Sequence, residues 1–197
     1  MKLYKRLPDT VTVDGKRYRL RPYFDRVLYV MDIMRGKGTE QQKIDAACYL
    51  LIKSKRVHNK GKVLSAALDM LLGHPTAEQG QKSFDFDQDA EYIYASFMQA
   101  YGIDLLERLD IDGQKPMHWL EFMALFSSLP EDTRMAQIIA IRTRELPAPT
   151  KENAKIRQQI MKQKSVFALK LSEEERKENF QRGLRKLADQ MKHLSEG

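Results

Sequence analysis

Apolar residues recur at helical spacing along almost the whole chain. In one segment Phe24, Val27, Leu28 and Met31 stand at positions i, i+3, i+4 and i+7, which places them on one face of an α-helix. Equivalent faces are formed by Ile44, Ala47, Cys48 and Leu51; by Leu64, Ala67, Leu68 and Leu71; by Ala90, Ile93, Phe97 and Ala100; and by Trp119, Phe122, Met123 and Phe126. A chain with this pattern is predicted to be mainly α-helical.

One clear β signal lies near the N-terminus, in the stretch TVTVDGKRYRL at residues 10–20. Asp14 and Gly15 suit a two-residue type I′ turn, because both central residues of that turn need positive φ. The resulting register places Val11 opposite Tyr18. We therefore expect a small β-hairpin at the N-terminus.

Helix starts and chain breaks suggest how the helices are grouped. Thr39 with Gln42, and Ser128 with Glu131, have the spacing of a capping box, and Pro130 would then stand in the first turn of the following helix. The Pro-rich stretch ELPAPT separates a compact helical domain, residues 1–146, from a basic helical appendage, residues 151–197. Within the domain, a glycine- and proline-containing loop separates two candidate layers, residues 1–73 and 84–146.

The end of the chain is predicted to form a basic amphipathic C-terminal helix. After a capping box of Ser172 and Glu175, apolar residues follow at steps of 4, 3, 4 and 3, which gives a coiled-coil seam over about two heptads. This helix could dock on its own domain or pair with a helix from a second copy or a partner, and the sequence leaves both open. The candidate partner-binding residues are Phe180, Leu184, Leu187, Met191 and Leu194.

Charge is distributed unevenly within the net charge of +7. Lys and Arg outnumber Asp and Glu by nine in residues 1–73 and by five in residues 147–197, whereas acids are in excess by seven in residues 74–146. Basic flanks are compatible with nucleic-acid binding, and segregated charge is equally compatible with self-association or a complementary partner. Five basic residues also gather in the stretch 53–62, but no aromatic residue accompanies them for stacking on bases. We expect this stretch to be a solvated connection and nucleic-acid binding to be unlikely.

Candidate catalytic or metal-binding residues are few. Asp85, Asp87 and Asp89 alternate as in an EF-hand loop, but Ala90 and Ser96 stand where that loop needs glycine and glutamate. We expect these acids to cap a helix start instead. The four histidines are scattered, and no phosphate-binding loop or nucleophile elbow is present. The sequence predicts no catalytic, cofactor or metal site, and therefore a protein that is not an enzyme.

We also expect the protein to carry no signal for export. Pro8 and Asp9 interrupt the N-terminal stretch before an apolar segment forms, and the longest unbroken apolar run, residues 46–52, is too short to cross a bilayer. The single cysteine, Cys48, lies within a helical stripe and is predicted to be buried. We expect a soluble cytoplasmic protein that does not contact a membrane.

Several unusual residues occur in an order that resembles a bacteriophage tail family, that of the fifteenth gene product of siphophages and prophages. In that family an acidic and aromatic helix ends in Tyr-Gly-Ile-Asp-Leu and is followed by a His-Trp-x-x-Phe helix, a Leu-Pro-Glu-Asp turn and a helix ending in Arg. The matching residues here, which we expect to be mainly structural, are Tyr101, Gly102, His118, Trp119, Phe122, Pro130 and Arg142. The strongest similarity covers residues 84–144, and weaker similarity reaches most of the chain.

The resemblance implies a role in tail morphogenesis. Members of this family are encoded near the tape-measure gene and are thought to act as tail assembly chaperones. Such a chaperone would keep the long helical tape-measure protein soluble in the host cytoplasm until the tail tube forms, and it would be absent from the mature virion. A homo-oligomer and contact with the tail tube protein are further expectations. The alternatives are a nucleic-acid-binding accessory protein and a structural tail protein retained in the virion.

Overall fold

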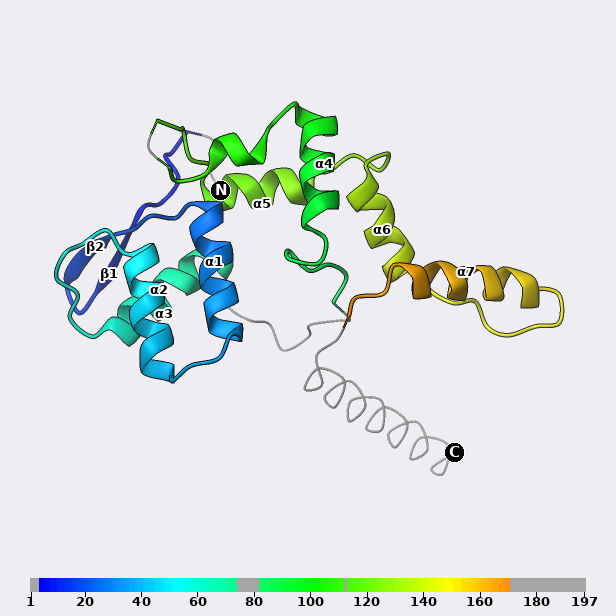
Figure 1. Ribbon diagram of the computed structural model, residues 1–197, viewed down its shortest axis with the longest axis horizontal. Helices are drawn as coiled ribbons and strands as arrows, with labels where there is room; N and C mark the ends of the chain where they lie inside the picture. Colours follow the sequence, from blue (N-terminus) through cyan, green and yellow to red (C-terminus); the bar gives the residue numbers. More distant parts are fainter. Residues whose placement is uncertain (1–3, 74–81, 112, 171–197) are drawn as a thin grey trace, which may run out of the picture. The chain divides into compact units, whose positions relative to one another are not determined.

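The computed structural model of the protein describes residues 4–73, 82–111 and 113–170 (Figure 1). This part of the chain holds seven α-helices, one short 3-10 helix and a two-stranded antiparallel hairpin. The prediction of a mainly α fold with a small N-terminal hairpin is confirmed. The chain divides into two units, residues 1–143 and 144–197.

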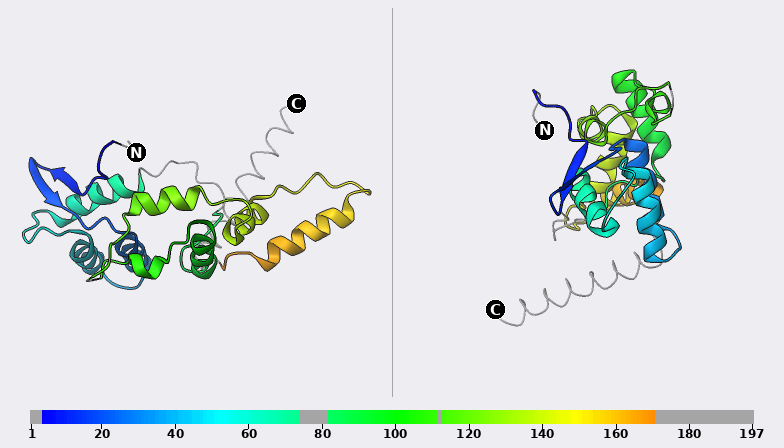
Figure 2. Two further views of the ribbon diagram at one scale, coloured as in Figure 1. Left: turned by 90° about the horizontal axis from the view of Figure 1, so that it is seen from above. Right: turned by 90° about the vertical axis from the view of Figure 1, so that its left-hand side faces the viewer.

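The hairpin consists of β1 (Thr10–Val13) and β2 (Lys16–Arg19) and has the expected register, with Val11 opposite Tyr18. Both of these side chains are buried. The turn residues Asp14 and Gly15 have φ values of 49° and 73°, as a type I′ turn requires. Strand β1 contacts the third helix, and the hairpin lies beside that helix in Figures 1 and 2.

Three helices follow the hairpin: α1 (Phe24–Arg35), α2 (Glu40–Leu51) and α3 (Lys60–Leu72). The predicted capping box at the start of α2 is present. The Gln42 N–H donates to Thr39 Oγ1 at 3.3 Å, and the Thr39 N–H donates to Gln42 Oε1 at 3.0 Å. Helix α2 packs against both α1 and α3, so the apolar faces seen in the sequence meet in one core.

The second group of helices in this unit comprises α4 (Ala90–Tyr101), the 3-10 helix η1 (Leu105–Arg108), α5 (Trp119–Ser127) and α6 (Arg134–Thr143). Helix α4 ends at Tyr101 and is capped by Gly102, whose φ of 63° is in the left-handed region that glycine adopts at low cost. Helix α4 packs against α5 and α6. The buried Ser96 of α4 accepts a hydrogen bond from the Met135 N–H of α6 at 3.0 Å.

The predicted capping box of Ser128 and Glu131 is wrong. Ser128 closes α5 instead, because its N–H donates to the Leu125 carbonyl and its φ and ψ of −108° and 15° differ from the extended geometry of an N-cap. Pro130 therefore lies in a turn before α6, where its carbonyl accepts from both the N–H and the hydroxyl of Thr133. Thr133 is buried, so this turn is fixed by contacts that the capping motif did not indicate.

A short extended segment, residues 19–24, joins the two groups of helices. On one side the Arg21 N–H donates to the Leu51 carbonyl at 2.7 Å, at the end of α2. On the other side the Pro22 carbonyl accepts from the Trp119 N–H at 2.7 Å, and the Phe24 N–H donates to the Met117 carbonyl at 3.1 Å. The start of α5 is therefore held by the segment that leads into α1.

The second unit is described over residues 144–170. Its Pro-rich segment is not helical, as predicted, and α7 (Ala154–Val166) follows. Thr150 and Asn153 exchange hydrogen bonds before α7 through the Asn153 Oδ1 and the Thr150 Oγ1. The predicted C-terminal helix at residues 172–197, with its capping box and its seam, lies outside the described residues.

Candidate functional site

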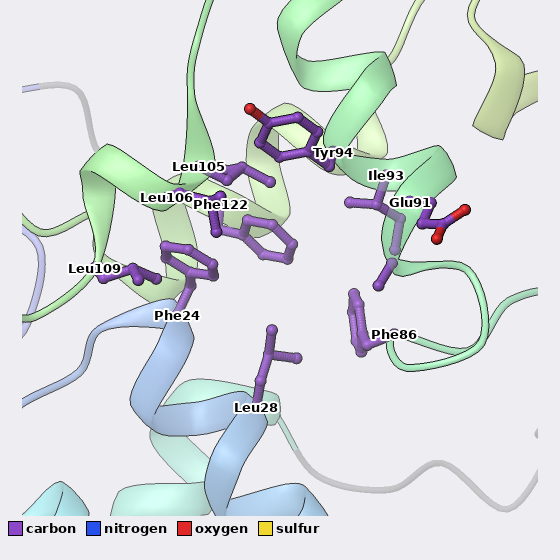
Figure 3. Close-up of a pocket in the computed structure, with 11 residues that line it drawn as sticks. Phe24, Leu28, Phe86, Glu91, Ile93, Tyr94, Leu105, Leu106, Leu109 and Phe122 are labelled. Atoms are coloured by element: carbon purple, nitrogen blue, oxygen red, sulfur yellow. The ribbon is translucent and has the colours of Figure 1, made fainter.

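An apolar pocket of about 390 Å³ opens in the first unit (Figure 3). Helices α1, α4 and α5, the 3-10 helix η1 and the segment before α4 all contribute side chains to it. In Figure 3, Leu28 points upward from α1 between Phe24 on one side and Phe86 on the other. Apart from Glu91 and the hydroxyl of Tyr94, the side chains that line the pocket are apolar. The pocket can therefore accept an apolar group but offers few polar groups to bind a polar substrate.

Local sequence rules explain how each wall of the pocket is formed. Phe24 and Leu28 are four residues apart on α1 and therefore project from the same face. On the opposite wall, the Asp104 carboxylate caps η1 by accepting from the Leu106 N–H at 2.8 Å. This turn directs Leu105 into the core, where it is 7% exposed, and leaves Leu106 at the edge, where it is 61% exposed.

Aromatic rings form the floor of the pocket. Phe122 is 1% exposed and is close to five other rings. Its centroid lies 5.0 Å from that of Phe24, 5.2 Å from Phe97 and 5.7 Å from Trp119. Phe84 and Phe86, which alternate with the acidic residues, join the same cluster. This aromatic cluster links α1, α4 and α5.

The acidic residues before α4 form a turn, and Asp85 is buried at its centre. Asp85 Oδ1 accepts from the N–H groups of Asp87 and Gln88, at 2.9 and 3.1 Å, while the Asp85 N–H donates to Asp89 Oδ2. Burial alone would raise the pKa of Asp85, but the Lys82 ammonium and these two backbone donors outweigh burial and lower the pKa. The prediction that these acids cap the start of α4 is wrong for Asp85, because its two backbone donors belong to the turn at residues 86–89, which precedes the helix.

Asp89 has a different role. It is the residue before α4, yet its side chain makes no capping bond and instead forms a two-pronged ion pair with Arg142 of α6. The two nitrogen-to-oxygen distances are 2.6 and 2.8 Å, and the two side chains are 1% and 10% exposed. Arg142 also donates to the Ser83 carbonyl at 3.1 Å. The pair connects α6 to the turn that carries Phe84 and Phe86.

Four of the other family-motif residues lie in the core or at helix ends of the same unit. The Tyr101 hydroxyl donates to the Leu125 carbonyl at 2.9 Å, and Gly102 ends α4. The indole N–H of Trp119 donates to the Leu71 carbonyl at 2.9 Å. With Phe122 in the aromatic cluster, these residues connect α5 to α3 and α4.

His118 is the residue before α5 and caps that helix in its neutral form. Its Nδ1 accepts from the Leu120 N–H at 3.0 Å, so the proton resides on Nε2, which donates to the Pro8 carbonyl at 3.0 Å. Burial lowers the pKa of His118 and outweighs the opposite effects of the Pro8 carbonyl, Glu121 and Asp9. A protonated ring would have a hydrogen on Nδ1 and would lose the cap.

This geometry predicts a pH dependence of stability. Because the folded-state pKa of His118 lies below its unfolded value of about 6.5, the unfolded state binds more protons as the pH falls, and the free energy of unfolding decreases. In His118→Asn the amide oxygen keeps the cap but does not titrate. We expect urea unfolding between about pH 7.5 and 5.5 to show a shallower pH dependence for this variant than for the wild type. Identical slopes for the two proteins would contradict this role of His118.

The Cys48 thiol lies in surroundings that disfavour the reactive thiolate. Burial raises the pKa of the Cys48 thiol, and Cys48 is the buried residue that the sequence predicted. Among the described residues, no group of three His, Cys, Asp or Glu side chains is arranged to hold a metal ion. None of the described helices has the length and apolar character needed to cross a membrane.

The residues that the sequence proposes for partner binding lie outside the described part of the chain. They are Phe180, Leu184, Leu187, Met191 and Leu194.

The basic stretch 53–62 connects α2 to α3 and continues into α3. Two of its five basic residues pair with carboxylates, Lys60 with Asp45 at 2.7 Å and Lys62 with Asp14 at 3.5 Å.

Sequence reasoning did not find the pocket. Its walls include Leu105, Leu106 and Leu109, which belong to a segment that has no regular helical pattern. The one signal that could have identified them is the density of leucines between Asp104 and Asp110 in a stretch too short for an α-helix.

Comparison with known proteins identifies a family. Residues 3–169 match the model of the family described as Bacteriophage Gp15 protein. No curated protein and no solved structure matches the chain. The match extends over most of the chain and includes both the pocket and all of the family-motif residues. The chain therefore belongs to the bacteriophage Gp15 protein family.

Proposed function

We propose that this phage protein is a tail assembly chaperone, which binds the tape-measure protein and keeps it soluble while the tail tube assembles. The observation that carries the proposal is the open apolar pocket, because its lining suits an apolar anchor of a partner protein and not the polar groups of a substrate. In this role the protein is not an enzyme. It acts in the host cytoplasm and leaves before the virion is complete.

Two further features support a binding role. A tape-measure protein is long and helical, and a helix that carries regularly spaced apolar residues inserts them into a groove of this kind. In the second unit, α7 exposes Ile156, Met161 and Val166, which are 52%, 54% and 66% exposed. These side chains offer additional apolar surface for a partner.

Co-expression with the tape-measure protein of the same phage tests the proposal. We expect the tape-measure protein to be insoluble alone and to co-elute with this protein in size-exclusion chromatography when both are produced. A variant that lacks residues 172–197 shows whether the predicted C-terminal helix contributes. A tape-measure protein that stays insoluble with both forms would overturn the proposal.

Two measurements distinguish the alternative functions. Binding to mixed-sequence DNA that weakens steeply with salt would indicate a nucleic-acid-binding protein. Detection of the protein in purified phage particles would indicate a structural protein of the virion.

A further inference from the structure

The edge of the apolar pocket is acidic. Glu91 lies on the first turn of α4 and is one of the residues that line the pocket. On the other side, Asp104 caps η1, and Glu107 is the third residue of η1. Together with Leu106, these three residues are called the pocket rim below.

The acids of the rim lie close to the pocket itself. Tyr94 lines the pocket. Burial raises the pKa of Tyr94, and the charge of Asp104, a hydrogen bond to Asp104 and the charge of Glu107 raise it further. Asp104 also directly precedes Leu105, which lines the pocket together with Leu106. The negative charge therefore lies next to residues that line the pocket.

This negative charge is not neutralised within the described part of the chain, where Glu91, Asp104 and Glu107 form no ion pair. The arginines of the neighbouring elements are occupied by other acids. These pairs are Arg35 with Asp87 at 3.0 Å, Arg26 with Asp110 at 3.1 Å and Arg108 with Glu121 at 3.4 Å. An approaching cation therefore meets three uncompensated carboxylates around an apolar cavity.

We propose that the pocket binds a basic amphipathic helix of the partner, whose apolar anchor residues enter the cavity while flanking Lys or Arg side chains face Glu91, Asp104 and Glu107. The apolar lining provides affinity, and the acidic rim selects helices with basic flanks over acidic ones. The partner is a segment of the tape-measure protein. This identity is the one part of the proposal that rests on the proposed function.

Fluorescence anisotropy with two labelled model helices tests this pairing on the full-length protein. Both helices carry leucine and phenylalanine at i, i+3, i+4 and i+7, and they differ only in having lysine or glutamate at the remaining charged positions. We expect the lysine helix to bind at least about tenfold more tightly than the glutamate helix at low salt, and this difference to shrink as salt is added. Equal binding of the two helices would overturn the proposal.

Variants of the rim localise the binding. Both Leu106→Lys and the double variant Glu91→Lys/Glu107→Lys alter exposed side chains and are expected to fold. Each should weaken binding of the lysine helix about tenfold, and the double variant should strengthen binding of the glutamate helix. Matched controls on exposed positions that do not line the pocket are Tyr49→Lys and Glu40→Lys/Glu131→Lys. If rim and control variants bind the lysine helix equally, the site is not this pocket.

A third peptide, with the sequence of residues 172–197, tests the alternative occupant. Its sequence has amphipathic spacing and contains six basic and six acidic residues. Tighter binding than that of the lysine helix, with the same sensitivity to the rim variants, would assign the pocket to this chain's own segment and overturn the proposal. The rim variants are also co-expressed with the tape-measure protein. A tape-measure protein held equally well by wild type and rim variants leaves the chaperone function intact and contradicts the pocket assignment. Failure of the wild type to hold it contradicts the chaperone function alone.

Discussion

Replacing Phe122 by alanine is expected to lower the free energy of unfolding by about 3–5 kcal/mol. Phe122 is 1% exposed, and its ring is close to those of Phe24, Phe86, Phe97, Trp119 and Phe126. Truncation removes buried apolar surface and leaves a void that surrounding rings from three helices and the segment before α4 cannot fill without moving. A domain of this size has a total stability of about 5–15 kcal/mol, so the variant is expected to be close to the limit of folding.

Urea unfolding followed by far-ultraviolet circular dichroism measures this effect. Phe122→Leu keeps most of the apolar volume and is expected to lose less stability than Phe122→Ala. Tyr49→Ala serves as the matched control, because Tyr49 is 78% exposed, and we expect it to change stability by no more than about 0.5 kcal/mol. A Phe122→Ala protein as stable as this control would show that the aromatic cluster is not the centre of the core.

The sequence predicted those parts of the fold that depend on neighbouring residues. The stripe of Phe24, Val27 and Leu28 became one face of α1, because helical spacing alone decides which residues share a face. The turn at Asp14 and Gly15 formed because few other residues accept positive φ at both positions. These features need no information about distant contacts.

A local motif failed where tertiary contacts decided the outcome. The spacing of Ser128 and Glu131 fits a capping box, but the same serine also suits the end of the preceding helix, and the structure uses it there. The buried Thr133 turn then sets the start of α6 at Arg134. Sequence spacing does not distinguish these two uses of serine, because both satisfy backbone groups at a helix terminus.

The pocket could not be predicted because five separate segments line it. Periodicity placed Phe24 and Phe122 on buried faces but gave no information on which faces would meet. Phe86 was hidden among alternating acids, and the burial of Asp85 beside it depends on backbone donors and on Lys82. The pairing of Asp89 with Arg142 joins residues 53 positions apart, so no local pattern could reveal it.

That pairing gives the second prediction of large effect. Arg142→Met is expected to lower the free energy of unfolding by about 3–5 kcal/mol, because it leaves the Asp89 carboxylate buried without its partner. Asp89 is 1% exposed, so water cannot replace the guanidinium without opening the contact between α6 and the turn before α4. Arg142→Lys keeps the charge but loses the two-pronged geometry, and we expect an intermediate loss.

The double variant Asp89→Leu/Arg142→Met separates the charge effect from packing. Because it removes both charges, we expect it to be more stable than Arg142→Met alone, and its loss to be smaller than the sum of the two single losses. The exposed pair of Lys60 and Asp45 is the matched control, and Lys60→Met is expected to have little effect because water screens that pair. Additive losses in the Asp89 and Arg142 cycle would show that the two residues stabilise the fold independently, through contacts other than their ion pair.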